Sequence, residues 1–168
     1  MQEERPLGEL WCPSSRPDPD SVVFAVRTDD PSDPGVAYLS NTAATTQQIL
    51  DLSGPVDPRE VFRFAAPCAT HGCAHFTGSR CSLITRIVEQ LPPAVLALPP
   101  CRIRARCRWF AEEGDAACRR CPVIVTLQNH PDEDIRIAAA PRSVVDEASS
   151  DTAPGSRRRI PLNIVQVS

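Results

Sequence analysis

The chain has 168 residues, 18 of them proline, and a formal net charge of −3. Its length allows one modest domain with tails and argues against a second full domain. Apart from three histidines, every basic side chain is arginine, which excludes chemistry based on a lysine Schiff base or a lysine general base. The negative net charge gives no general reason to expect nucleic-acid binding.

The N-terminal half is predicted to contain a β-hairpin followed by short helices. Residues 21–28 and 36–42 are apolar and β-branched, which predicts two strands, and the turn residues between them favour their pairing. Residues 45–54 predict a short helix that ends at Gly54.

Two further helices have clear start signals. The first is predicted over residues 57–64, with Asp57 as N-cap and Pro58 at the first helical position. The second covers residues 82–91, where leucine, isoleucine and valine form one apolar stripe behind a Ser82 cap.

The C-terminal half is predicted to contain short helices and one strand. Residues 108–114 and 115–121 predict two consecutive short helices, the second ending before a proline. Residues 123–127 predict a strand, and residues 132–140 predict a last helix with acidic residues at its start.

These elements predict an α+β fold: a small, irregular, metal-stapled domain with an N-terminal β-hairpin and short helices. We expect a lead-in segment over residues 1–20, a single cysteine-rich domain over 21–140 and a disordered tail over 141–168. The N-terminus contains acidic residues and no apolar core, unlike a secretory signal. The longest apolar run, residues 92–100, is interrupted by prolines and is far shorter than the roughly 20 residues of a membrane helix. We therefore expect a cytoplasmic protein that does not associate with membranes.

The eight cysteines are the main functional signal, because in a reducing cytosol they are expected to be metal ligands or redox groups. Their spacing forms two sets, and the chain between the sets is long enough to return to its starting end. The first set is Cys68, Cys73 and Cys81, and the second set is Cys101, Cys107, Cys118 and Cys121. If Cys12 joins the first set, the cysteines match two four-thiolate clusters. A free thiol behind Trp11 is the alternative for Cys12.

Cys118 and Cys121 have the i, i+3 spacing that places two thiolates on the same side of a helical turn, as for one metal centre. Together with the following proline they form the sequence C-R-R-C-P. This five-residue stretch resembles the cluster-binding run of bacterial-type ferredoxins, in which a Cys-Pro closes the motif. The irregular spacing of the cysteines is also similar to that in the auxiliary cluster domains of radical enzymes. The resemblance implies an iron-sulfur cofactor.

Arginines alternate with other residues between Cys101 and Cys107. In an extended conformation both cysteines would face one side, and the arginines the other. These arginines are Arg102, Arg104, Arg106 and Arg108. Because six residues of strand cover about 20 Å, either the segment bends or the two cysteines serve different sites. The arginines are expected to compensate the charge of a thiolate centre and favour its reduced state, or to form a solvated face.

The kind of metal centre is left open by the spacing. Zinc sites commonly use paired C-x2-C knuckles, of which there is one, whereas iron-sulfur sites accept irregular spacings. One or two 4Fe-4S clusters are therefore the first expectation, and zinc is the alternative. His71 and His75 lie within the first set as alternative ligands or as ordinary surface and packing residues. Metal binding would also supplement the core of a chain in which aromatic residues make up 5%.

Three functions follow from this pattern. The first is a small iron-sulfur protein for electron transfer or redox sensing, with an acidic redox partner; it would be a carrier or an accessory protein rather than a stand-alone enzyme. No nucleotide-binding or zinc-protease motif is present. The second is a zinc-stapled module that binds nucleic acid or protein, in which Trp109 would contact a base. The third is a dithiol oxidoreductase that uses Cys118 and Cys121, although they lie at the wrong end of a helix for thiolate activation.

Overall fold

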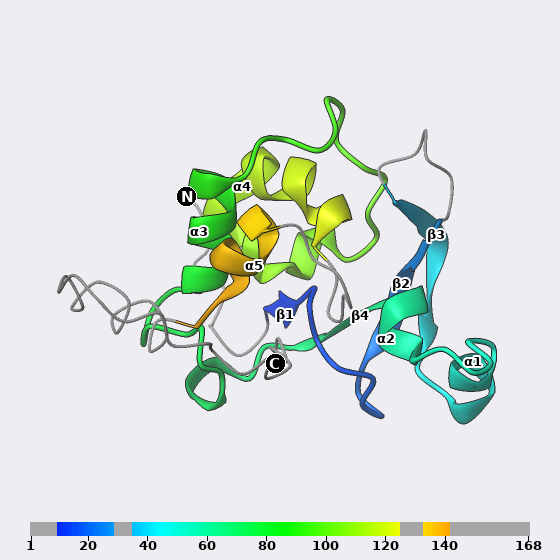
Figure 1. The fold of residues 1–168 in the computed structure, drawn as a ribbon. Helices are drawn as coiled ribbons and strands as arrows, with labels where there is room; N and C mark the ends of the chain where they lie inside the picture. Colours follow the sequence, from blue (N-terminus) through cyan, green and yellow to red (C-terminus); the bar gives the residue numbers. More distant parts are fainter. Residues whose placement is uncertain (1–9, 29–34, 125–132, 142–168) are drawn as a thin grey trace, which may run out of the picture.

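A four-stranded antiparallel sheet and a group of helices make up the described part of the chain, which comprises residues 10–28, 35–124 and 133–141 of the computed structural model (Figure 1). The strand order is β1-β4-β2-β3. The strands are β1 (Trp11–Cys12), β2 (Val22–Arg27), β3 (Val36–Ala44) and β4 (Phe62–Pro67). The predicted α+β class and the predicted hairpin of β2 and β3 are confirmed.

The prediction of a helix over residues 57–64 is wrong in its second half. The helix α2 (Pro58–Val61) begins after Asp57, whose side chain accepts a hydrogen bond from the N–H of Arg59, but it ends at once and β4 follows. Five consecutive residues of β4 are buried, because its two faces contribute to different core clusters: Ala65 to one, and Phe62 and Phe64 to another. In a strand covered on both faces, apolar and polar residues do not alternate, so the hydrophobic pattern of the sequence does not identify it as a strand.

Three helices pack together at the end of the sheet that carries β1 (Figure 1). They are α3 (Ser82–Gln90), α4 (Arg108–Arg120) and α5 (Glu133–Ala139). The apolar stripe of α3 is buried in their shared core, as predicted. The N-cap of α3 is Cys81 and not Ser82, whose hydroxyl instead donates to the carbonyl of His75.

The helix α4 joins the two helices predicted over residues 108–114 and 115–121. The junction is Gly114, whose φ of 58° and ψ of −139° interrupt the helix. α5 confirms the predicted last helix. The strand predicted over 123–127 is absent from its described part, since Val123 lies in the 3-10 turn η4 (Cys121–Val123) and most of the rest lies outside the described residues.

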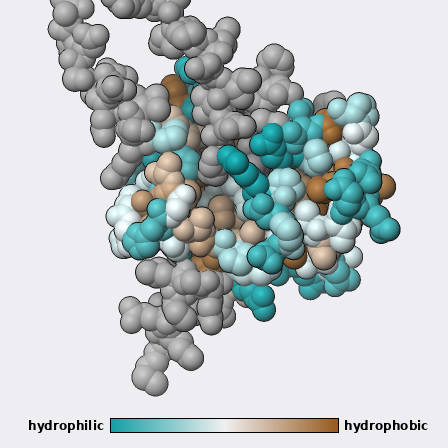
Figure 2. All heavy atoms as spheres, turned by 90° about the horizontal axis from the view of Figure 1, so that it is seen from below, coloured by the Kyte–Doolittle hydropathy of each residue, from teal (hydrophilic) through white to brown (hydrophobic). Residues whose placement is uncertain are grey.

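The remaining predictions on chain organisation have mixed outcomes. Trp11 and Cys12 pair with β4 and so belong to the sheet, while the tail from residue 142 onward lies outside the described residues. A short helix α1 (Gln47–Asp51) follows β3, as predicted. On the face shown in Figure 2, apolar residues form small groups among hydrophilic ones. Within the described ranges no helix has the length and apolar character needed to cross a membrane.

Candidate metal centres

The eight cysteines face two cavities, four in each. The first cavity contains about 360 Å³ of space between atoms and the second about 340 Å³, in each case including space open to solvent. The cysteines of the first cavity are Cys12, Cys68, Cys73 and Cys81. Those of the second cavity are Cys101, Cys107, Cys118 and Cys121. All eight are free thiols. The structure thus groups the cysteines into the two sets expected from their spacing and places Cys12 with the first set.

Strand pairing brings two cysteines of the first cavity together. Cys12 is in β1, opposite Ala66 of β4, and Cys68 directly follows β4. The N–H of Cys68 donates to the carbonyl of Leu10 at 2.8 Å, which extends the pairing by one residue. Thiols that are distant in the sequence are therefore held side by side by backbone hydrogen bonds.

The loop between β4 and α3 supplies the other two cysteines of the first cavity. Cys73 follows a 3-10 turn, η2 (Thr70–Gly72), and Cys81 is the N-cap of α3. The N–H of Cys81 donates to Oε2 of Glu112 at 2.9 Å, which ties the start of α3 to α4. A bridge between Phe76 and Cys81 closes the loop, so both thiols return to the end of the sheet.

The segment from residue 101 to 108 bends, which resolves the choice left open by its sequence. Ile103 is buried against the sheet, and a 3-10 turn, η3 (Arg104–Arg106), follows it. Cys107 is then the N-cap of α4. Because of this bend, Cys101 and Cys107 line the same cavity.

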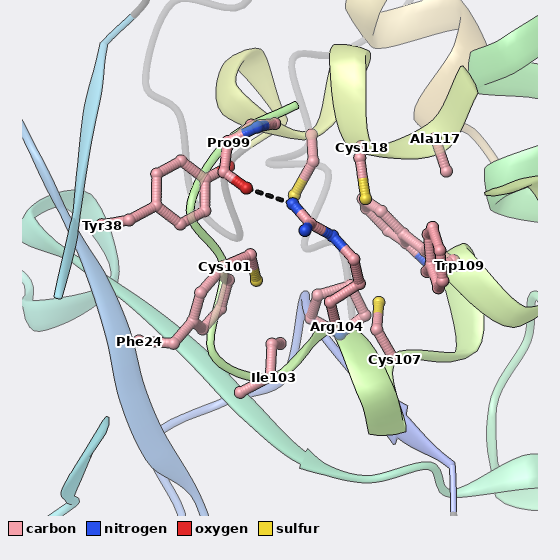
Figure 3. A pocket seen from close by; sticks show the side chains of 13 residues that line it. Phe24, Tyr38, Pro99, Cys101, Ile103, Arg104, Cys107, Trp109, Ala117 and Cys118 are labelled. Carbon is pink, nitrogen blue, oxygen red and sulfur yellow. Dashed lines mark hydrogen bonds between the residues drawn. The ribbon is translucent and has the colours of Figure 1, made fainter. Parts of the chain in front are cut away.

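The last turn of α4 completes the second cavity. Cys118 lies within α4 and Cys121 is its C-cap, so their i, i+3 spacing places both at the cavity. Figure 3 shows the sulfur atoms of Cys101, Cys107 and Cys118 directed toward a common space, with the Arg104 side chain extending between them. The thiols thus surround the cavity from three different parts of the chain.

The four arginines of this segment do not share a face, so the arrangement predicted for an extended strand is wrong. Arg102 and Arg106 are exposed and are not among the residues that line the two cavities. Arg104 lines the second cavity and Arg108 lines the first. Only these two can act directly on a bound group, whereas Arg102 and Arg106 are available to solvent or a partner.

Arg108 connects a cysteine of the first cavity to an acidic residue. Its side chain is 1% exposed, its Nε donates to Sγ of Cys68 at 3.0 Å, and its Nη1 donates to Oε1 of Glu112 at 2.8 Å. The charge of Arg108 is therefore shared between Glu112 and the first cavity.

Arg63 is a fully buried cation beside the second cavity. Its Nη1 donates to the carbonyl of Cys121 at 2.8 Å and its Nη2 lies 3.5 Å from Sγ of the same residue. A third contact is to the carbonyl of Pro13, and the guanidinium lies 5.5 Å from the ring centre of Phe24. Among the ion pairs of the described residues, none involves Arg63. A buried cation is costly unless an anion compensates it, so Arg63 fits a negatively charged group in the second cavity.

Besides Nε of Arg104 at the second cavity, two buried polar atoms of uncharged residues at the cavities lack a hydrogen-bond partner. One is Oγ of Ser14, which lines the first cavity, and the other is Nε1 of Trp109, which lines both cavities. Buried donors are normally paired, and an unpaired one indicates a missing ion, ligand or water. Both atoms therefore fit a group with acceptor atoms, such as the sulfides and thiolates of a cluster.

Burial favours the neutral form of several cavity thiols when no metal is bound. Burial, helped by the neighbouring thiols of Cys81, Cys68 and Cys73, raises the pKa of Cys12 to about 12, although the backbone N–H of Ser14 acts in the opposite direction. Burial also raises the pKa of Cys101 to about 11, with Cys121 and Cys118 adding to the effect. A metal group that binds here replaces these protons, because thiolates are the ligands.

Within the described ranges, no three cysteine, histidine or acidic side chains are grouped so that a single metal ion could bind them. Four thiolates on one zinc ion lie roughly 4 Å apart, since each sulfur is about 2.3 Å from the metal. In an iron-sulfur cluster each cysteine binds a different iron, so the sulfurs are farther apart. Four thiols at each cavity match the number of ligands of either centre.

Neither histidine of the first set is arranged as a metal ligand. His71 is exposed and its ring lies 5.1 Å from that of Phe76, centre to centre. His75 is buried at the first cavity, and Nη2 of Arg86 lies 3.3 Å from its Nδ1. Burial, together with Arg86, lowers the pKa of His75 to about 4, so it is neutral. Because arginine only donates, Nδ1 accepts and the proton lies on Nε2, which prevents Nε2 from binding a metal in this tautomer.

Comparison with known proteins was uninformative: no family model, curated protein or solved structure matches this chain. The interpretation of the two cavities therefore depends on their own geometry and chemistry.

Sequence reasoning missed some residues at the cavities and assigned another wrongly. Arg63 and Ser14 were not predicted as site residues; the only signal for Arg63 is a single charge within the apolar run VFRFAA. Trp109 is 1% exposed, so the stacking on a nucleic-acid base that the zinc alternative requires is not possible.

Proposed function

We propose that the chain is a small iron-sulfur protein with two 4Fe-4S centres, which transfers electrons or senses redox state. One observation carries this proposal: the eight cysteines divide between two cavities, four in each. Four thiolates are the usual ligand set of a 4Fe-4S cluster. Each set would hold one cluster, whose irons supply the one-electron chemistry.

The charges around the cavities support anionic centres. A 4Fe-4S core of charge +2 with four thiolates has a net charge of −2. Arg63 and Arg104 lie at the second cavity and Arg108 at the first, with two of them buried. Cations next to a cluster favour the reduced state, so these arginines would raise the reduction potentials. A zinc tetrathiolate has the same net charge, so this argument supports a tetrathiolate centre in general.

The exposed side of the second centre favours an acidic partner protein. Cys101 is half-buried and lines, with Arg102 and Arg104, an open groove next to the second cavity. The exposed Arg106 is the last residue of the turn that begins with Arg104. Electrons would enter or leave through this side, to a redox protein or a larger enzyme with acidic residues around its own centre. A reducing compartment such as the cytoplasm would keep the thiols available for cluster assembly.

The dithiol oxidoreductase is disfavoured by the positions of Cys118 and Cys121. Both are only 9% exposed, and both lie in the last turn of α4 or at its C-cap. Burial raises the pKa of the Cys118 thiol, although Arg104 acts in the opposite direction. A catalytic dithiol needs an accessible thiolate with a lowered pKa.

Anaerobic purification tests the proposal. We expect a brown protein with about eight iron and about eight sulfide ions per chain, which takes up and releases one electron at each centre. A colourless protein with one or two zinc ions per chain would support the zinc-stapled module instead. A colourless, metal-free protein that reduces disulfides would support the oxidoreductase.

A further inference from the structure

Trp109 lies between the two cysteine cavities. It is among the residues that line the first cavity and among those that line the second. Its side chain is 1% exposed, and it follows directly after Cys107, which faces the second cavity, and Arg108, which contacts the first. The start of α4 therefore separates the two cavities, and the indole ring of Trp109 lies between them.

The indole N–H has no acceptor within the protein. Nε1 of Trp109 is buried and makes no hydrogen bond in the structure. An unpaired buried N–H costs about 1 to 3 kcal/mol, so an acceptor is expected beside it when the protein is complete. Because the ring lines both cysteine cavities, the sulfur atoms of a bound cluster are candidate acceptors.

We propose that the two centres exchange electrons directly across Trp109, and that the indole N–H donates a hydrogen bond to a sulfur of one of them. This inference rests on the proposed function. In the exchange, one electron leaves the reduced core of one centre and enters the oxidised core of the other, and no bond forms or breaks. An external redox protein supplies or accepts the electron at the second centre, next to the open groove.

The hydrogen bond makes the two centres unequal. A donor to a cluster sulfur stabilises the reduced form, which carries one more negative charge, and so raises the reduction potential. The centre that accepts from Trp109 is therefore reduced more easily than it would be without this contact. A difference of this kind gives electron flow between the two centres a direction.

Trp109→Phe is the direct test, because phenylalanine keeps the aromatic packing and removes the N–H. The matched control is Trp11→Phe: Trp11 is half-buried, contacts Arg106, and is not among the residues that line either cavity. Both variants and the unsubstituted protein are titrated anaerobically, and the iron content and the two reduction potentials are measured. We expect Trp109→Phe to keep its iron and to lower one potential, while Trp11→Phe changes neither.

Two measurements without a change at Trp109 cover the case in which Trp109→Phe does not fold. The electron paramagnetic resonance spectrum of the fully reduced protein should be broadened beyond the sum of its two centres, because spins separated by one side chain interact. The chain has two tryptophans, so nitrogen-15 indole labelling of Trp11→Phe leaves the signal of Trp109 alone. This signal should be strongly shifted or broadened when the cluster is bound.

The results separate this inference from the proposed function. A protein with full iron, additive resonance spectra and potentials unaffected by Trp109→Phe overturns the role of Trp109 and leaves two independent centres. An unshifted indole signal in the loaded Trp11→Phe protein does the same. A protein without iron overturns both proposals.

Discussion

Replacement of Arg63 by methionine should have little effect on the stability of the metal-free protein but should weaken retention of the second cluster. In the metal-free protein the carbonyls of Cys121 and Pro13 lose their donor, at a cost of about 1 to 3 kcal/mol. Removal of the uncompensated buried charge stabilises the protein by a similar amount, because buried ionic groups can often be replaced by apolar ones without loss of stability. We therefore expect the free energy of unfolding of the metal-free protein to change by less than about 2 kcal/mol.

In the loaded protein the same substitution removes a positive charge next to an anionic centre. Nη2 of Arg63 lies 3.5 Å from Sγ of Cys121, and two unit charges at about 4 Å interact by about 4 kcal/mol at an effective dielectric constant of about 20. Since the charge of a cluster is spread over several atoms, we expect a loss of about 2 to 4 kcal/mol. This corresponds to about 30-fold to about 800-fold weaker retention of the second cluster.

The assay has two parts. Denaturant unfolding gives the stability of the metal-free Arg63→Met protein, and anaerobic titration with an iron chelator gives the retention of each cluster. The first centre serves as an internal reference, and Arg27→Met, which changes an exposed arginine on the same sheet, is the control. If Arg63→Met destabilises the metal-free protein strongly and leaves the chelator titration unchanged, Arg63 is an ordinary structural residue and the reasoning is refuted.

Three further substitutions test separate parts of the account. Cys68→Ser and Cys118→Ser should each lose about half of the iron and leave the other centre intact, whereas complete loss in both would show one shared site. Gly114→Ala should lower the free energy of unfolding by about 1 to 3 kcal/mol in a denaturant titration; nothing lies within 4 Å of the added Cβ, so the cost is the strain of a positive φ, and an unchanged midpoint would contradict it. Ser14→Ala should change the free energy of unfolding of the metal-free protein by less than about 1 kcal/mol and should lower the reduction potential of the first centre. A potential equal to that of the unsubstituted protein would show that the Ser14 hydroxyl does not contact the cluster.

The two cysteine sets could be predicted from the sequence because their members lie close together along the chain, whereas the spacing alone leaves the place of Cys12 open. The helix between the two sets and the proline-rich return segment bring distant cysteines to the same end of the molecule. Gly114 likewise marks the junction in α4, since glycine adopts a positive φ without a Cβ penalty. These predictions depend on spacing and local backbone preference, which are visible in a single sequence.

The central strand and its arginine could not be predicted in the same way. β4 is buried on both faces and directly follows a helix with a strong start signal, so the helix predicted over residues 57–64 runs past the end of α2 at Val61. An arginine in such a run is normally taken as a surface residue, whereas Arg63 is fully buried. Its environment is created by Pro13 and Cys121, which are distant in the sequence and meet only in the folded chain.

The central claim is that each set of four cysteines binds one cluster. Native mass spectrometry of anaerobically prepared protein tests it directly, because the whole metal content of a single chain is weighed at once. The account predicts a main species with the mass of the chain plus two 4Fe-4S cores, and species with one core in Cys68→Ser and in Cys118→Ser. A main species with the mass of the chain alone, or of the chain with zinc, would contradict it.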